Sequence, residues 1–221
     1  MNSLVKICGL STPESVRTAL CGGATHLGFI FFEKSPRNVS PRLAARLVED
    51  IDNIKTVAVT VNADEEFLDQ IVETMNPDIL QLHGNESSAR VAEIKQRYQR
   101  PVMKALAIRD ASDLDKVSTY EEVTDMFLLD AQPPQGSELP GGNGVSFDWS
   151  LIAGLNSSVP ILLSGGINQS NVNMAFNYLQ DPDNDLVGID VSSGVESAPG
   201  VKDILKIEKF LAACHHHKIK D

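Results

Sequence analysis

Cysteine is scarce in this chain, which contains only Cys8, Cys21 and Cys214 and no CxxC pair. Such an odd, widely spaced set excludes a disulfide framework and a cysteine-ligated zinc site, and it is typical of a reducing compartment such as the cytoplasm. The chain also lacks an apolar run near the roughly 18 residues of a membrane span, and it lacks the basic and apolar segments of a secretory signal. We therefore expect a cytoplasmic protein without a membrane partner.

Basic residues are outnumbered, because 19 Lys and Arg stand against 30 Asp and Glu, which gives a formal net charge of -11. A general nucleic-acid or anionic-membrane surface would need a basic face, so neither partner is expected. A small anionic substrate is not excluded, since it needs only a local nest of backbone amides and one or two cations. With 221 residues and 42% hydrophobic content, the chain can bury one sizeable core.

Short apolar runs recur along the chain with amphipathic stretches between them, and each run has the length of a buried parallel strand. Capping residues before prolines, as at Thr12-Pro13 and Ser40-Pro41, are typical of helix starts. Eight alternations predict a single (β/α)₈ TIM barrel over residues 1–221, with a polar tail at 215–221. The alternative, a doubly wound open sheet, would usually stop at five or six strands. The runs are residues 4–8, 26–31, 56–61, 79–83, 102–106, 126–130, 160–164 and 186–191.

Alternation within the strands predicts which side chains face the barrel axis. In the first run Val5 and Ile7 should face the helices, while Lys6 and Cys8 should face the axis. The eighth run should turn Val187, Ile189 and Val191 outward. Four more polar side chains should then reach the same mouth from other strands: Gln81, His83, Asp130 and Asp190.

Each of these polar residues also has a structural interpretation. A buried cysteine such as Cys8 usually behaves as a small hydrophobe, and His83 could be a hydrogen-bonded structural histidine. Lys6 could simply pair with a neighbouring carboxylate. Asp130 is less ambiguous, because a carboxylate that closes an apolar strand needs a partner or a chemical role.

Two glycine-containing turns follow the seventh and eighth strands, Ser164-Gly165-Gly166 and Ser192-Ser193-Gly194. Barrel enzymes often bind phosphate between these two loops, where glycine lets backbone N–H groups approach the ligand. Two ordinary tight turns are the alternative. The longest irregular segment, residues 132–144, follows the sixth strand and is rich in Pro and Gly. Its position predicts a lid over the site, although a tolerated insertion would look the same.

Taken in order, several short motifs resemble the phosphoribosylanthranilate isomerase family of tryptophan biosynthesis over nearly the whole chain. Each motif alone is short, but the ordered set is specific. The motifs are Lys6-Ile7-Cys8-Gly9, Gly28-Phe29-Ile30-Phe31 with Lys34-Ser35-Pro36-Arg37, Gln81-Leu82-His83-Gly84, Leu129-Asp130 with Gly141-Gly142-Asn143-Gly144 and Phe147-Asp148-Trp149, Ser164-Gly165-Gly166-Ile167, and Asp190-Val191-Ser192-Ser193-Gly194-Val195-Glu196.

The resemblance implies an Amadori rearrangement of N-(5-phospho-β-D-ribosyl)anthranilate to 1-(2-carboxyphenylamino)-1-deoxy-D-ribulose 5-phosphate, with no metal and no organic cofactor. It also implies that Asp130 is the general acid and Cys8 the general base, with Arg37 on the substrate carboxylate. Lys6 beside Cys8 would favour the thiolate. The remaining expected contacts are His83 and Asp190 with the substrate, and Gly165, Gly166, Ser193 and Gly194 with its phosphate.

Other enzymes and a binding protein remain as competing interpretations. A histidine-pathway sugar isomerase would use two aspartates, whereas strand one here ends in Cys8. Indole-glycerol-phosphate synthase would show a lysine and glutamate pattern, and a pentose-phosphate epimerase would need several metal ligands. A non-catalytic phosphosugar-binding barrel would not need both Cys8 and Asp130. We expect a monomer, because no apolar patch is evident.

Overall fold

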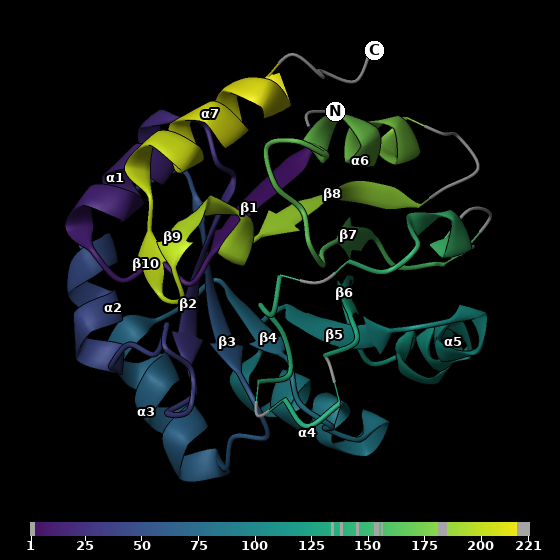
Figure 1. The fold of residues 1–221 in the computed structure, drawn as a ribbon. Helices are drawn as coiled ribbons and strands as arrows, with labels where there is room; N and C mark the ends of the chain where they lie inside the picture. Colours follow the sequence, from purple (N-terminus) through teal and green to yellow (C-terminus); the bar gives the residue numbers. More distant parts are fainter. Residues whose placement is uncertain are drawn as a thin grey trace.

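Eight parallel strands close into a barrel in which each strand pairs with the next in sequence and β8 pairs with β1 (Figure 1). This closed ring of parallel strands confirms the predicted TIM barrel. The computed structural model describes residues 3–133, 135–137, 139–144, 146–152, 155, 157–180 and 185–215. Its strands are β1 (Leu4–Cys8), β2 (His26–Phe31), β3 (Lys55–Thr60), β4 (Ile79–Leu82), β5 (Val102–Ile108), β6 (Met126–Ala131), β7 (Ile161–Leu163) and β8 (Leu186–Val191).

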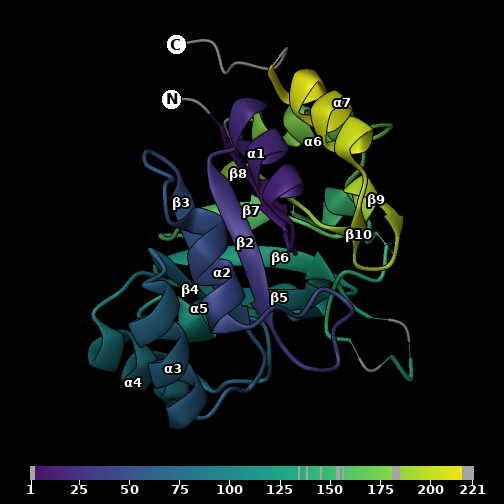
Figure 2. The ribbon, with the colours of Figure 1, turned by 90° about the vertical axis from the view of Figure 1, so that its left-hand side faces the viewer.

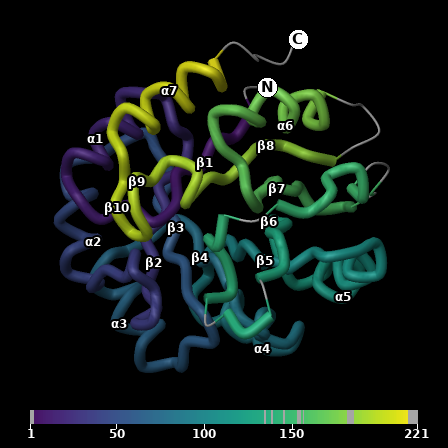
Figure 3. The backbone as a smooth tube through the Cα atoms, viewed as in Figure 1, coloured from purple at the N-terminus to yellow at the C-terminus, as the bar shows by residue number. Residues whose placement is uncertain are grey.

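Helices cover the outside of the barrel, and the tube in Figure 3 follows the alternation of strand and helix. The predicted caps are present, since the Thr12 side chain accepts from Ser15 N and the Ser40 side chain from Leu43 N. Among the described residues, no helix is long and apolar enough to cross a membrane. The helices are α1 (Pro13–Cys21), α2 (Pro41–Val48), α3 (Glu65–Met75), α4 (Ser88–Tyr98), α5 (Lys116–Tyr120), α6 (Val172–Leu179) and α7 (Ile204–His215).

The interval after β6 departs from the regular repeat. Its described part holds only a 3₁₀ turn, η2 (Trp149–Ile152), where a sixth helix was expected. The interval after β5 is also shortened, because the 3₁₀ turn η1 (Ala111–Asp115) leads directly into the five-residue helix α5. At the other end of the chain, α7 lies beside α1 and α6 (Figure 1). His215 ends α7, and the rest of the predicted tail lies outside the described residues.

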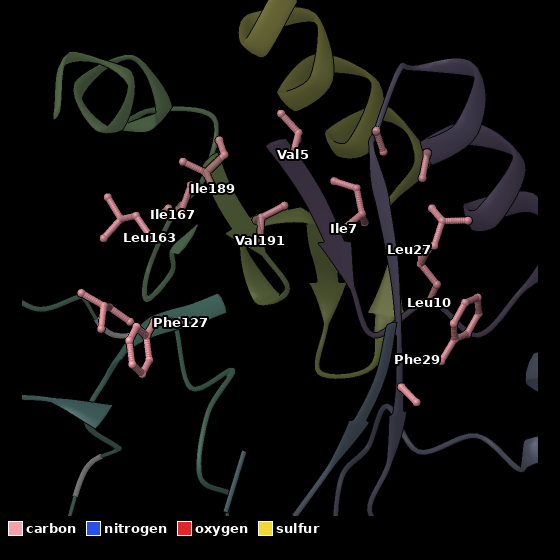
Figure 4. Close-up of a cluster of buried hydrophobic side chains, with 14 of the residues drawn as sticks. Val5, Ile7, Leu10, Leu27, Phe29, Phe127, Leu163, Ile167, Ile189 and Val191 are labelled. Carbon is pink, nitrogen blue, oxygen red and sulfur yellow. The ribbon is translucent and has the colours of Figure 1, made fainter. Parts of the chain in front are cut away.

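Strand alternation sorts the core into two layers, as predicted. Figure 4 shows the outer layer, in which Val5 and Ile7 of β1 pack among apolar side chains from the neighbouring elements. This layer includes residues from all eight strands, which fits one continuous domain. The inner layer fills the barrel axis, and its members are Cys8, Val57, Val59, Ile79, Met103, Ala105, Leu128 and Leu162.

Strand β8 carries an irregularity that the alternation rule did not predict. Ile161 of β7 pairs with Leu186, but the next residue, Leu162, pairs with Gly188. Val187 is thus an extra residue, and it packs against the inner layer. The prediction that Val187 faces outward was wrong, because a bulge inserts one residue and reverses the alternation there. Ile189 and Val191 face outward as predicted.

Two features extend the barrel mouth at the carboxyl ends of the strands. A short 3₁₀ turn, η3 (Ser193–Val195), follows β8 and leads into a hairpin of β9 (Glu196–Ala198) and β10 (Val201–Lys202). Figure 2 shows this hairpin and the loop that follows β6 on the same side of the barrel, toward which the arrowhead of β6 points. The sequence pattern had not predicted the hairpin. Together these segments surround the cavity described next.

Candidate active site

Most of the residues predicted for the site lie around one cavity at the barrel mouth. It is lined by Cys8 from β1, Arg37 from the loop after β2, His83, Asp130, Asp190, Gly165, Gly166 and Ser193. Two predicted residues do not line it. Lys6 lies one layer deeper in the barrel, and Gly194 packs instead against the carbonyl of Ile167. Within the described residues, no group of three or more metal-ligating side chains is arranged to hold a metal ion.

Cys8 lies above a buried ion pair. Lys6 Nζ donates to Asp190 Oδ1 at 2.7 Å, and the Lys6 side chain is fully buried. Burial alone would lower the pKa of Lys6, but the Asp190 carboxylate, together with the Cys8 side chain, outweighs burial and raises that pKa. The neighbouring Gly28 leaves space here, because a Cβ on it would lie 3.0 Å from Cys8 Sγ and 3.1 Å from Lys6 Nζ.

Burial raises the pKa of the Cys8 thiol above its ordinary value. Lys6 and Lys202 act in the opposite direction, and Asp190 adds to the increase. Lys6 therefore favours the thiolate, as the sequence suggested, but its effect is smaller than the effect of burial. The resting side chain at neutral pH is the thiol, and its thiolate is a stronger base than that of an exposed cysteine.

Asp130 is contacted from its own strand, β6, and from the residue that follows β4. Its Oδ1 accepts from Ala131 N at 2.9 Å, and its Oδ2 lies 3.3 Å from Nε2 of His83. Gln81 Nε2 lies 2.9 Å from the other ring nitrogen, Nδ1 of His83. In the tautomer with the ring proton on Nε2, Nδ1 accepts from Gln81 and the proton faces Asp130. The Oε1 atom of Gln81 is buried with no partner among the described residues.

The loops after β7 and β8 form the glycine-lined part of the cavity. Gly165 and Gly166 both have positive φ, +81° and +68°. A Cβ on Gly165 would lie 2.6 Å from Ala131 N, and one on Gly166 would lie 2.7 Å from Ser146 Cβ, so neither position has room for a side chain. Ser164 Oγ donates to Asp190 Oδ2 at 3.0 Å, which joins this loop to the Lys6 ion pair.

Arg37 belongs to a buried charge cluster that the sequence pattern had not predicted. Its Nε donates to Glu196 Oε1 at 2.7 Å and its Nη2 donates to Glu196 Oε2 at 2.8 Å. Lys202 Nζ also donates to Glu196 Oε1, at 2.8 Å. Burial would raise the pKa of Glu196, but Arg37 and Lys202 together hold it below its ordinary value. We call these three residues the mouth cluster.

Residues 139–144 of the predicted lid lie over the cavity and line it. A side chain on Gly141 would collide with Asp130 Oδ2 and His83 Nε2, and a Cβ on Gly142 would lie 2.7 Å from Arg37 Nη1. Gly142 O accepts from Arg37 Nη2 at 3.1 Å. Glycine thus lets the loop backbone approach both the Asp130 and His83 side chains and the Arg37 guanidinium.

Several further residues around the cavity have no role assigned from the sequence. Glu196 was part of a quoted motif but received no role, although a carboxylate just beyond β8 was a usable signal. Lys202 carried no signal, because its burial depends on a hairpin and on contacts with distant residues. Ser164 and Ser192 belong to predicted turns, but Ser192 Oγ donates to the Cys8 carbonyl at 3.2 Å, a contact that spacing cannot show.

Comparisons with known proteins agree with this geometry. A family model described as N-(5'phosphoribosyl)anthranilate (PRA) isomerase matches residues 5–213. An N-(5'-phosphoribosyl)anthranilate isomerase of Brucella canis is 55% identical over 210 residues, which cover 95% of this chain and 92% of that protein. The solved phosphoribosyl anthranilate isomerase of Thermotoga maritima is 33% identical with a TM-score of 0.84, covering 97% of this chain and 99% of that one.

A further solved structure shows such an isomerase in complex with reduced 1-(o-carboxyphenylamino)-1-deoxyribulose 5-phosphate. It is 30% identical to this chain with a TM-score of 0.80, and the match covers 97% of this chain and 99% of that one.

The fold and the cavity define a class, the (β/α)₈-barrel enzymes that place acid–base residues and a glycine-lined anion site at the carboxyl ends of their strands. Within that class, the chain belongs to the N-(5'-phosphoribosyl)anthranilate isomerase family. Its activity is the aldose–ketose isomerisation of phosphoribosylanthranilate in tryptophan biosynthesis.

Proposed function

We propose that Cys8 and Asp130 are the two proton-transferring groups of this isomerisation, with Asp130 as general acid and Cys8 as general base. The observation that supports this most directly is that both side chains line one cavity, from β1 and from β6. An Amadori rearrangement gives a proton to one substrate atom and takes a proton from another. Two separate groups on different strands suit that requirement.

Asp130 acts first, by protonating the furanose ring oxygen. The bond between that oxygen and C1 then breaks, and the anthranilate nitrogen lone pair forms the C=N bond of a Schiff base. Ala131 N donates to Asp130 Oδ1 and His83 Nε2 lies 3.3 Å from Oδ2, so the carboxyl group has fixed neighbours before the substrate arrives. The lid residues, with Gly141 beside Asp130, exclude water from this step.

Cys8 acts second, as the thiolate that removes the C2 proton. The electron pair of that C–H bond moves to form an enolamine, which tautomerises to the ketone. Burial costs the thiolate its hydration, and the cations Lys6 and Lys202 offset part of that cost. Because its pKa is raised, the thiolate that does form has a high affinity for a carbon-bound proton.

Substrate groups would be held around these two residues. Arg37 would bind the anthranilate carboxylate, and Asp190 would accept from sugar hydroxyls while its ion pair with Lys6 fixes its position. The phosphate would lie at Gly165, Gly166, Ser193 and the neighbouring Gly194, where the turns after β7 and β8 meet. The ligand of the related solved structure carries both a carboxyphenyl group and a phosphate, which is consistent with two anion subsites.

The roles of Cys8 and Asp130 are tested with C8A and D130N. Phosphoribosylanthranilate made in situ is fluorescent, and the wild-type protein should remove its signal. Each variant should lower kcat by at least about 10²-fold, the contribution typical of a positioned acid or base, while it still binds the reduced product analogue. Matched controls are C21A and D115N, which change an exposed cysteine and an exposed aspartate outside the cavity and should retain wild-type rates.

Near-wild-type turnover by C8A or D130N would remove that residue from its role. A folded wild-type protein that leaves the fluorescence unchanged would remove the isomerase proposal as a whole.

We further propose that the protein is a single-domain monomer of the cytoplasm that works without metal or organic cofactor. Within the described residues, the large apolar side chains that are exposed are Met174, Val201 and Leu205, which form too small a surface for a stable dimer. Free cysteines suit a reducing compartment. Sedimentation equilibrium should give a mass near 24.0 kDa, and treatment with a chelator should leave the rate unchanged.

A further inference from the structure

The mouth cluster contains two cations and one carboxylate. We propose that Glu196 and Lys202 are positioning residues for the carboxylate end of the substrate. Glu196 fixes one edge of the Arg37 guanidinium. Lys202 balances the negative charge of Glu196, so that the cluster keeps one net positive charge for the substrate carboxylate. This inference rests on the proposed role of Arg37, and it adds two residues that do not touch the substrate.

The geometry leaves one part of the guanidinium free. Glu196 occupies Nε and Nη2 of Arg37, and Gly142 O takes a second hydrogen bond from Nη2. The remaining nitrogen, Nη1, has no acceptor in the described part of the chain and lies against Gly142, which lines the cavity. A bidentate carboxylate is the arrangement that best fixes a guanidinium, so Glu196 sets the direction in which Nη1 points.

The charge balance gives Lys202 its role. Arg37 is 3% exposed, and the side chains of Glu196 and Lys202 are 4% and 3% exposed, so all three charges are buried. An Arg37–Glu196 pair alone would be neutral and would attract an anion weakly. With Lys202 the cluster carries one positive charge in excess, which is costly in a buried site unless an anion completes it. The substrate carboxylate supplies that anion.

The hairpin of β9 and β10 is the scaffold for this arrangement. Glu196 begins β9 and Lys202 ends β10, and Gly200 N in the turn donates to Glu196 Oε2 at 3.2 Å. A side chain on Gly200 would collide with the carbonyl of Pro36, so the turn packs closely against the loop that carries Arg37. Lys202 Nζ also donates to Ser192 O at 2.8 Å, which anchors the hairpin to the end of β8.

The decisive variant is K202M, which keeps most of the side-chain volume and removes the charge. Two substrates are compared, phosphoribosylanthranilate and the corresponding phosphoribosylaniline, which lacks the carboxylate. For the anthranilate compound, KM should rise about ten- to hundredfold, the effect expected when a charged contact is weakened, while for the aniline compound KM should stay within about twofold. Because Lys202 also offsets part of the cost of forming the Cys8 thiolate, kcat should fall by a similar factor for both substrates, and the difference in KM tests the inference. The matched control is K209M, an exposed lysine of α7, which should change neither substrate.

A second variant, E196Q, separates positioning from charge alone. It raises the net positive charge of the mouth cluster, so a purely electrostatic role predicts a lower KM for the anthranilate compound. Positioning by Glu196 predicts a higher KM, because the guanidinium loses its fixed orientation. Far-UV circular dichroism and thermal unfolding establish that each variant is folded, and K202M decides the outcome on its own if E196Q does not fold.

Three results would overturn the inference. K202M could leave KM for the anthranilate compound unchanged, it could raise KM equally for both substrates, which would indicate an effect on the fold, or E196Q could lower KM for the anthranilate compound. A wild-type protein that does not convert phosphoribosylanthranilate would instead contradict the proposed function, so the two failures are distinguishable.

Discussion

Two lysines, Lys6 in β1 and Lys104 in β5, are almost completely buried, and their side chains point to opposite faces of the barrel wall. Lys6 faces the barrel axis and pairs with Asp190 beneath Cys8. Lys104 faces the helices, where its Nζ donates to Glu86 Oε2 at 2.8 Å and lies 5.7 Å from the centre of the Tyr120 ring. Alternation within a strand therefore decides whether a buried cation lies at the barrel axis or against the helices.

The scaffold role of Lys104 is visible in its partners. Glu86 also accepts from Asn62 N and Gly84 N, which fastens the loops after β3 and β4 to each other. Burial lowers the pKa of Lys104 despite Glu86, whereas Asp190 and Cys8 raise the pKa of Lys6. The inward lysine thus has the Asp190 carboxylate and the Cys8 thiol as neighbours, and the outward lysine has the Glu86 carboxylate. Substitution of each lysine tests whether the two ion pairs differ in function or only in position.

The largest effect is expected for K6M. Removing one member of a buried ion pair leaves Asp190 uncompensated, so unfolding in urea should show a loss of about 3–5 kcal/mol. Turnover should fall by about 10²-fold or more, because Asp190 and Cys8 both lose their cation. The double variant K6M/D190N should recover much of the stability without recovering activity. Equal recovery of both would contradict a chemical role for Lys6.

A smaller effect is expected for K104M, the matched change on the other face of the barrel. Glu86 keeps two backbone donors, so the loss of stability should be near the lower end for a buried pair, about 3 kcal/mol. The folded variant should retain kcat within about tenfold of wild type, since Lys104 does not line the cavity. If K104M lost as much activity as K6M, the distinction between the two lysines would fail.

The smallest effect concerns His26, which pairs in register with Lys6 and lies near the base of the barrel axis. Burial, assisted by Lys6, lowers the pKa of His26 from 6.5 to about 4. The unfolded chain therefore binds a proton at a pH where the folded protein does not, and stability is lost as the pH falls from 6.5 toward 4. Between pH 7 and pH 5 the loss should be about 2 kcal/mol.

Urea unfolding at a series of pH values measures this loss for wild type and for H26Q. The variant should show a flatter profile over the same interval. An unchanged slope in H26Q would assign the pH dependence to other groups.

The barrel and most of the inward-facing polar residues could be predicted from the sequence, because strand alternation and the order of the strands are local signals. Cys8, His83, Asp130 and Asp190 line the cavity for that reason. Val187 could not be placed, since a single bulged residue changes no composition and depends on pairing between β7 and β8. Lys202 and the hairpin depend on contacts with Glu196 and Arg37, and the latter lies far away in the sequence. Burial of Lys104 also carries no local signal.

The pairing of β1 with β8 has a consequence for how the protein is made. Lys6 and Asp190 are separated by 184 positions, and Ser192 Oγ reaches the Cys8 carbonyl over the same separation. During synthesis Cys8 emerges among the first residues, but its partners emerge only in the last part of the chain. Until then Cys8 lacks the complete buried surroundings that raise the pKa of its thiol, and no N-terminal fragment without β8 contains the ion pair beneath it. The ring can close, and this ion pair can form, only after the last strand has been made.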